Sequence, residues 1–121
     1  MKDLVLIIDD DQSVLAAFTR ILRKEKFVAS TLSQLENAMD YISIKKPRVV
    51  IIDLKIPGNE SIELIRQIKR MFNNIYIIIM TAYSNSFTER DAIELGADVY
   101  LKKPFEVSFF LSKLYRLVDQ N

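Results

Sequence analysis

The chain has 121 residues, 50% of them hydrophobic and 27% charged, so it can bury a full core and is expected to form a single domain, 1–121. Its 17 basic and 16 acidic residues leave a net charge of +1, which indicates neither a nucleic-acid surface nor a membrane surface. It has no cysteine and no histidine, which excludes disulfides, thiolate chemistry, the usual zinc ligands and a phosphohistidine on this chain.

Short apolar runs alternate with segments of helical spacing along the whole chain. The runs, which predict buried parallel strands, are 4–8, 27–31, 49–53, 75–81 and 99–101. The helical segments are 13–26, 35–42, 61–72, roughly 86–95 and 107–118. None of these runs approaches the roughly 18–20 apolar residues of a membrane span, and the first begins too early to leave room for a signal peptide. We therefore expect a cytoplasmic protein without membrane contact.

Turn-forming and capping residues mark the boundaries of these segments. Pro47 is expected to end the second helix and Ser61 to cap the third. Pro57-Gly58 predicts a turn, and Gly96 is placed as the C-terminal cap of the fourth helix.

Five successive strand–helix units predict an α/β fold with helices on both faces of a doubly wound, five-stranded parallel sheet. The periodicity alone does not fix the strand order. A flavodoxin-like order, 2-1-3-4-5, with five helices would place the first and third strands side by side.

Polar side chains follow the strands at their carboxyl ends, where open α/β sheets bind ligands. Asp9 and Asp10 follow the first strand, Asp53 ends the third, Thr81 ends the fourth and Lys103 follows the fifth. Two carboxylates about 4 Å apart repel by roughly 4 kcal/mol at an effective dielectric of about 20. One acid must therefore be protonated, or a cation must be bound. Oxygen ligands favour Mg²⁺ or Ca²⁺, and few carboxylates with open positions favour Mg²⁺.

Simpler roles explain some of these residues. Asp11 is expected to cap the first helix, and Lys102 to be a solvated lysine. Tyr100 can be plain edge-strand packing. The Lys103-Pro104 bond is a candidate cis peptide that would aim Lys103 over the cleft.

Taken together, the motifs resemble the receiver (response-regulator, chemotaxis-Y-like) domain of two-component signalling. They occur in order and span nearly the whole chain: 6–11 (LIIDDD), 53–58 (DLKIPG), 79–82 (IMTA), 94–98 (ELGAD) and 103–105 (KPF).

The resemblance implies a role for each matching residue. Asp53 is the expected phospho-acceptor, and Mg²⁺ is expected on Asp9, Asp10, Asp53 and the backbone carbonyl of Lys55. Lys55 and Ala82 are expected at the phosphate, with Thr81 and Lys103 contacting its oxygens. Thr81 and Tyr100 would form a switch that changes the face of the fourth helix, fifth strand and fifth helix.

The resemblance also implies partners and leaves alternatives. The phosphoryl donor would be a histidine kinase or a histidine phosphotransfer protein, and the receiver would catalyse only its own phosphorylation and dephosphorylation. It would control an output domain or a target protein, without touching nucleic acid itself, and homodimerisation through the switch face, with exposed Phe87 and Phe109, is open. A stand-alone phosphorelay carrier is the main alternative.

One loop departs from the family pattern, and two positions are ones that tune it. The loop 56–61 lacks the family's second glycine. Lys55 and Tyr83, two residues beyond Asp53 and Thr81, are bulky and resemble those of long-lived phosphorelay receivers.

The sequence also bears on competing functions. Lys55 argues against a Mg²⁺-dependent phospho-aspartate phosphohydrolase, because such an enzyme requires a second catalytic aspartate at that position. The acidic 9–11 cluster argues against a flavodoxin-like cofactor binder, whereas a receiver-shaped module that takes no phosphate stays open.

Overall fold

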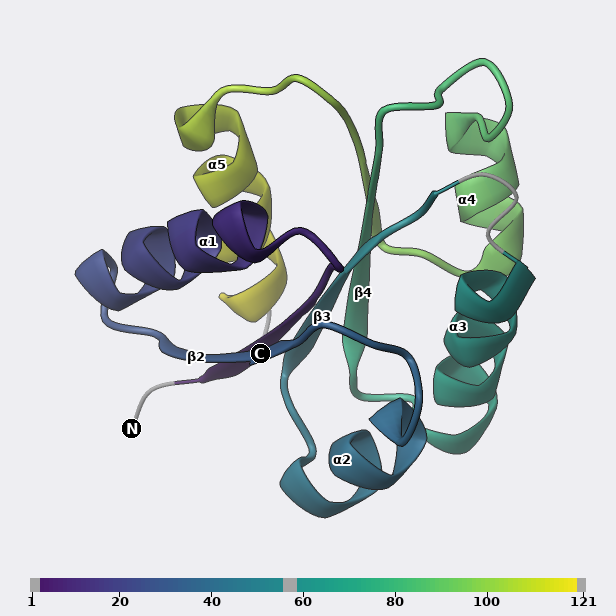
Figure 1. Ribbon diagram of the computed structural model, residues 1–121, viewed down its shortest axis with the longest axis horizontal. Coiled ribbons are helices and arrows are strands. Elements are labelled where there is room, and N and C mark those ends of the chain that lie inside the picture. Colours follow the sequence, from purple (N-terminus) through teal and green to yellow (C-terminus); the bar gives the residue numbers. More distant parts are fainter. Residues whose placement is uncertain (1–2, 56–58, 120–121) are drawn as a thin grey trace.

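The computed structural model describes residues 3–55 and 59–119, with a sheet at the centre and helices on both sides (Figure 1). In chain order its elements are β1 Leu4–Ile8, α1 Gln12–Lys24, β2 Val28–Leu32, α2 Ala38–Lys45, β3 Val49–Asp53, α3 Asn59–Met71, β4 Tyr76–Thr81, α4 Glu89–Leu95, β5 Val99–Lys102 and α5 Val107–Val118.

All strand pairs are parallel, and the order in the sheet is β2-β1-β3-β4-β5. This confirms the predicted doubly wound fold and its strand order. The register pairs Ile8 with Ile52, so the residue after each, Asp9 and Asp53, lies at the same edge of two adjacent strands. Met80 pairs with Asp53, which places Thr81 one residue further along the next strand.

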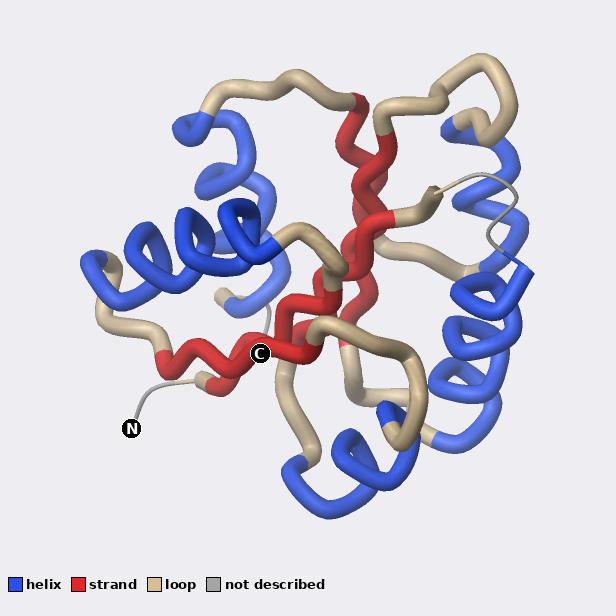
Figure 2. The backbone as a smooth tube through the Cα atoms, viewed as in Figure 1, coloured by secondary structure: helices blue, strands red, loops and turns tan. Residues whose placement is uncertain are grey.

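The sheet lies between two layers of helices (Figure 2). A hydrophobic cluster lies between the sheet and each of these layers. Alternate residues of the central strand serve the two sides, since Val49 and Ile51 join the first cluster and Val50 and Ile52 join the second. The first cluster includes Leu15, Phe18 and Leu22 of α1 and Phe110, Leu114 and Leu117 of α5. The second includes Ile42 of α2, Leu64, Ile65 and Ile68 of α3 and Ala92 of α4. Burial on both faces explains why β3 is apolar throughout until Asp53.

Several predicted helix boundaries were wrong. The first helix ends at Lys24 rather than at Lys26, whose φ is +71°. The second begins at Ala38, after Asn37 in the left-handed region, so Leu35 lies before it. The third begins at Asn59, so Ser61 lies inside the helix and does not cap it. The predicted turn at 57–58 lies outside the described residues.

The fourth helix is shorter than predicted, because Thr88 forms a capping box with Asp91 and α4 starts only at Glu89. Its predicted C-terminal cap is confirmed. Gly96 has φ +105°, and its N–H donates to the carbonyls of Ala92 and Ile93. Among the described residues, no helix is both long and apolar enough to cross a membrane.

The left-handed position after α4 predicts a difference between two substitutions. Gly96→Ala should lower the free energy of unfolding by about 1–2 kcal/mol, because an L-residue in this region is strained. A Cβ there would lie 3.3 Å from Cγ of Lys69, a flexible side chain that can move, so strain is the main cost. Lys46→Gly, at the left-handed position after α2, is the control and should leave stability unchanged or higher. Urea unfolding measures both, and equal losses from the two would contradict the assignment.

Candidate functional site

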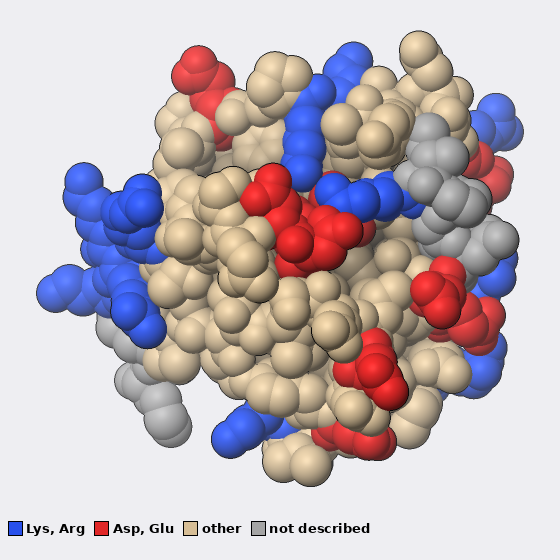
Figure 3. Space-filling model, viewed as in Figure 1, with Lys and Arg blue, Asp and Glu red and all other residues tan. Residues whose placement is uncertain are grey.

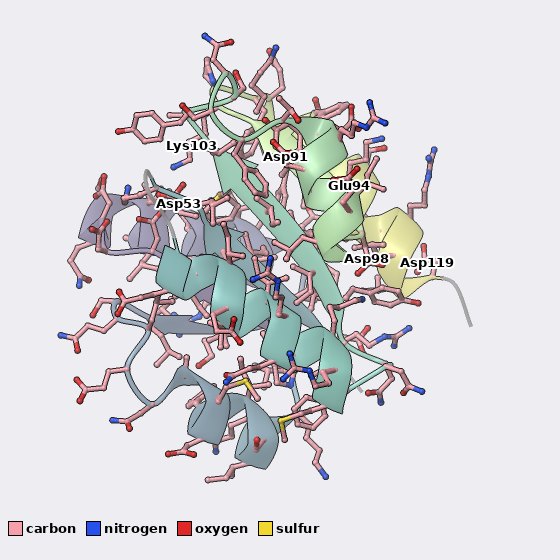
Figure 4. The ribbon with its side chains drawn as sticks, turned by 90° about the vertical axis from the view of Figure 1, so that its right-hand side faces the viewer. Asp53, Asp91, Glu94, Asp98, Lys103 and Asp119 are labelled. Carbon is pink, nitrogen blue, oxygen red and sulfur yellow. The ribbon has the colours of Figure 1, made fainter. Side chains whose placement is uncertain are left out.

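Acidic side chains gather at the carboxyl edge of the sheet, and two basic side chains lie against them (Figure 3). Asp53 lies at the centre of this cluster, because it ends the middle strand of the sheet. Its side chain is only 3% exposed, and each carboxylate oxygen faces a different lysine. Lys103 Nζ lies 3.1 Å from Oδ1 and Lys55 Nζ lies 2.7 Å from Oδ2. Figure 4 shows Lys103 directed toward Asp53 from the strand end above it.

Asp9 is the deepest acid of the cluster, with a fully buried side chain. Its Oδ1 accepts a hydrogen bond from the Asp11 N–H at 3.0 Å, and its Oδ2 lies 3.8 Å from Lys103 Nζ. Burial raises the pKa of Asp9, and the charge of Asp53 raises it further, whereas the Asp11 N–H and the two lysines lower it. Asp9 therefore binds a proton more readily than an ordinary aspartate.

Asp10 and Asp11 lie at the rim. The Asp10 side chain is 68% exposed, and its Oδ1 lies 3.4 Å from Lys55 Nζ. Asp11 caps α1, as predicted, and its Oδ1 accepts from the backbone N–H and the hydroxyl of Ser13 at 2.9 and 2.6 Å. These hydrogen bonds with Ser13 lower the pKa of Asp11. The three consecutive aspartates thus have three different surroundings.

Sequence reasoning expected Lys55 at the phosphate but did not predict that its ammonium pairs with the acids of the cluster. It lies within 4 Å of all three acids, at 2.7 Å from Asp53, 3.4 Å from Asp10 and 3.9 Å from Asp9. The hydrogen bond to Asp53 raises the pKa of Lys55 well above its usual range. With Lys103, it brings two positive charges to three carboxylates, leaving one net negative charge. The signal for it was its position two residues beyond Asp53, just past the strand.

Thr81 is fully buried, and its hydroxyl already has two partners. It donates to the carbonyl of Leu54 at 3.0 Å and accepts from the N–H of Tyr83 at 2.9 Å. A new acceptor for this hydroxyl must therefore replace Leu54. Ala82 follows it at the exposed end of β4.

Lys103 and Tyr100 come from the last strand and the loop after it. The Lys103 N–H donates to the Thr81 carbonyl at 2.8 Å, and the Lys103–Pro104 bond is cis, as expected. Tyr100 is half-buried against the second cluster, and its hydroxyl donates to the carbonyl of Phe87 at 2.6 Å. Burial raises the pKa of Tyr100, helped by the charges of Glu89 and Asp91. The structure thus ties β5 to the loop that precedes α4.

The donor atoms suit a hard divalent ion, although the acids do not form a complete cage. Among residues 3–55 and 59–119, no three acidic side chains are grouped so as to hold a metal ion by themselves. Within the same residues, Oδ2 of Asp9 is buried without a hydrogen-bond donor, which leaves its lone pairs available, whereas Oδ2 of Asp53 faces Lys55 Nζ at 2.7 Å. Mg²⁺ usually takes only one or two carboxylates and keeps several waters. The ligand set Asp9, Asp10, Asp53 and the Lys55 carbonyl therefore fits the ion and stays a prediction.

Comparisons with known proteins agree on one family. The profile described as "Response regulator receiver domain" matches residues 5–115. The chain is 32% identical over 107 residues to sporulation initiation phosphotransferase F of Bacillus subtilis (strain 168), covering 88% of this chain and 86% of that protein. It is 31% identical over 118 residues to the DNA-binding transcriptional regulator NtrC of Klebsiella pneumoniae, covering 98% of this chain but only 25% of that protein.

A solved structure shows the same fold. The response regulator receiver domain protein (CheY-like) from Methanospirillum hungatei JF-1 superimposes with a TM-score of 0.89 at 23% identity. The superposition covers 99% of this chain and 96% of the other.

The surroundings of Asp9 predict that its charge destabilises the fold. Asp9→Asn should raise the free energy of unfolding at pH 7 by about 1 kcal/mol, because the amide keeps an acceptor for Asp11 without a buried charge. Since the folded pKa of Asp9 is raised, the wild type loses stability as pH rises from about 3.8 through that pKa. The advantage of the variant should vanish as pH falls below 3.8. Asp11→Asn is the control, because a lowered pKa predicts a loss at pH 7 instead. Thermal unfolding across pH measures both, and a destabilised Asp9→Asn protein at pH 7 would contradict the prediction.

Proposed function

Because this chain belongs to the response regulator receiver family of two-component signalling, we propose that Asp53 is its phospho-acceptor and that phosphorylation switches its surface. Proteins of this family are signalling proteins rather than conventional enzymes. They work with histidine kinases and with output domains, and they generally use Mg²⁺ for phosphorylation.

The observation that carries the proposal is the setting of the Asp53 carboxylate. It is almost fully buried at the end of the central strand, with an ammonium group on each oxygen and a hydroxyl-bearing strand end beside it. Nothing in the hydrophobic core requires a carboxylate at this position. Positive groups on both sides suit a nucleophile that must accept a phosphoryl group carrying up to two further negative charges.

The transfer itself needs mainly positioning and charge compensation. A carboxylate oxygen of Asp53 attacks phosphorus, the bond from phosphorus to the donor nitrogen breaks, and its electron pair returns to the imidazole. The chain has no histidine, so the phosphohistidine must lie on a partner, either a kinase or a phosphotransfer protein. Lys103, now paired with Oδ1 of Asp53, would pair with a phosphoryl oxygen in the product.

Asp10 and Asp53, with Asp9 and the Lys55 carbonyl, would hold Mg²⁺. When bound, the ion would supply positive charge to the phosphoryl oxygens, in addition to that of Lys103. Asp9 and Asp10 supply the negative charge that attracts it, and among the described residues the buried Oδ2 of Asp9 has no hydrogen-bond donor, whereas Oδ2 of Asp53 faces the ammonium of Lys55.

Two contacts support a switch that starts at Thr81. Its hydroxyl must leave the Leu54 carbonyl to donate to a phosphoryl oxygen, while the N–H of Ala82 would donate to another. Tyr83 would move with Thr81, because the N–H of Tyr83 donates a hydrogen bond to the Thr81 hydroxyl. The loop from Tyr83 to Phe87 carries the carbonyl that accepts from Tyr100, so moving the loop changes the support of that ring.

The face of α4, β5 and α5 is the surface that would change. Ile93, Val107 and Phe109 are exposed there, at 65%, 48% and 49%. Phe87 was predicted to be exposed, but it is only partly so, because it packs against the second cluster. An output domain, a target protein or a second copy of this chain could bind such a surface.

A stand-alone phosphorelay carrier is the second candidate. It is favoured by the similarity to the B. subtilis phosphotransferase, which this chain matches over most of both lengths. The exposed side chain of Lys55 lies 2.7 Å from Asp53, and Tyr83 is exposed two residues beyond Thr81. Bulky side chains at these two positions would obstruct hydrolysis by water and lengthen the life of the phosphate. The cation Lys55 at the position of a second catalytic aspartate disfavours a phosphohydrolase.

Removing the acceptor should abolish phosphorylation. Asp53→Asn should reduce labelling by a phosphohistidine donor, or by acetyl phosphate with Mg²⁺, to background, because an amide is not a competent nucleophile. Gel mobility in the presence of a phosphate-binding reagent measures the product, which should be labile to hydroxylamine. Asp11→Asn is the matched control and should be labelled normally. Hydroxylamine-labile phosphate on Asp53→Asn would refute the assignment.

Thr81 should separate labelling from switching. Thr81→Ala should still accept phosphate on Asp53, but the NMR shift changes at Phe87 and Tyr100 on phosphorylation should fall by at least half. Thr81→Ser keeps the hydroxyl and should restore them. The alanine variant should also lose about 1–2 kcal/mol of stability, because the Leu54 carbonyl and Tyr83 N–H lose their partner. Full shift changes in Thr81→Ala would exclude this threonine as the switch.

A further inference from the structure

We propose that the Lys55 ammonium competes with the divalent cation for the acidic cluster. The ammonium must leave the cluster before the ion can bind, and it therefore sets the affinity of the site for the ion. The inference rests on the proposed Mg²⁺ site and adds a regulator to it. It concerns the side chain of Lys55, whereas the ligand role proposed above concerns its backbone carbonyl.

The position of this ammonium carries the inference. It is the group on which the three acids converge, with 2.7, 3.4 and 3.9 Å to Asp53, Asp10 and Asp9. Lys103 lies on the other side, at 3.1 Å from Asp53 and 3.8 Å from Asp9. Of these two lysines, Lys55 is the one within ion-pair distance of Asp10, the exposed acid that an ion arriving from solvent meets first.

Like charges make the two occupants mutually exclusive. An ion bound between Asp10 and Asp53 would lie within a few ångströms of the present Nζ position, and the repulsion between a dication and an ammonium is strong at that distance. The same carboxylate lone pairs would also have to serve both cations. One cation therefore replaces the other.

Lys55 is free to leave, whereas Lys103 is more enclosed. The Lys55 side chain is 47% exposed, against 25% for Lys103. Its residue lies past the end of β3, beyond Leu54, whose N–H donates to the Met80 carbonyl and holds the strand end in place. The long side chain can rotate into solvent while the sheet stays unchanged.

Two opposite effects follow for the neutral variant Lys55→Gln. Without divalent ions it should unfold at a lower temperature, because Lys103 is then the one remaining counter-charge for three carboxylates among the residues that the structure describes. With Mg²⁺ it should bind the ion about fivefold to tenfold more tightly than the wild type, since no ammonium has to be displaced. A residue that merely supports the fold would lower stability without improving ion binding.

The test is calorimetric titration of the unphosphorylated protein with MgCl₂, alongside thermal unfolding with and without the ion. Lys55→Arg keeps the charge and should stay close to the wild type. Lys102→Gln removes the same charge from an exposed position at the end of β5, and it should leave the affinity unchanged. Asp10→Asn in both backgrounds should weaken binding, which locates the ion at this cluster.

The outcomes separate the inference from the proposed function beneath it. Equal affinities for wild type and Lys55→Gln, or weaker binding by Lys55→Gln, would overturn the competitor role while leaving the metal site in place. An equal gain in Mg²⁺ affinity in Lys102→Gln would show that the effect comes from net charge alone, and it would also overturn the competitor role of Lys55. No Mg²⁺ binding by any of the proteins would remove the proposed metal site itself.

Discussion

Repulsion between buried carboxylates at the carboxyl edge of the sheet is the constraint on which the rest of the structure depends. The parallel register brings Asp9 and Asp53 to adjacent strand ends, where both side chains are removed from water. In this structure the repulsion is offset by Lys55 and Lys103, one from each side. Each process proposed for the site, whether ion binding or phosphoryl transfer, exchanges one of these counter-charges for another.

Thr81 links this electrostatic centre to the surface. Its hydroxyl is bonded to Leu54 and Tyr83, so it connects the strand that carries Asp53 to the loop before α4. That loop in turn supplies the carbonyl that accepts from Tyr100. Consecutive hydrogen bonds therefore connect Thr81 to the loop before α4 and to β5. A change of partner at Thr81 can affect both elements while the central strands stay in place.

The sequence predicted the strands, the sheet order and most of the cluster, because apolar runs buried on both faces end abruptly on Asp9, Asp53 and Thr81. The helix starts were less predictable, since they depend on local capping such as the Thr88–Asp91 capping box. The spacing of hydrophobic residues does not reveal such a cap. Lys55 was expected at the phosphate, but the pairing of its side chain with the acids was not predicted, for a different reason. Its place among the acids depends on the direction of a long side chain beyond a strand end, and periodicity carries no information on that direction.

The division of the core into two clusters has a consequence for whatever binds the α4-β5-α5 surface. α4 and Tyr100 pack on one side of the sheet, whereas α5 packs on the other with an aromatic group of Phe18, Phe105 and Phe110. Motion of α4 therefore requires no repacking beneath α5. A partner that contacts both helices would bind α5, which stays in place, and α4, which moves. Its affinity would therefore depend on the position of α4 relative to α5 rather than on the shape of either helix.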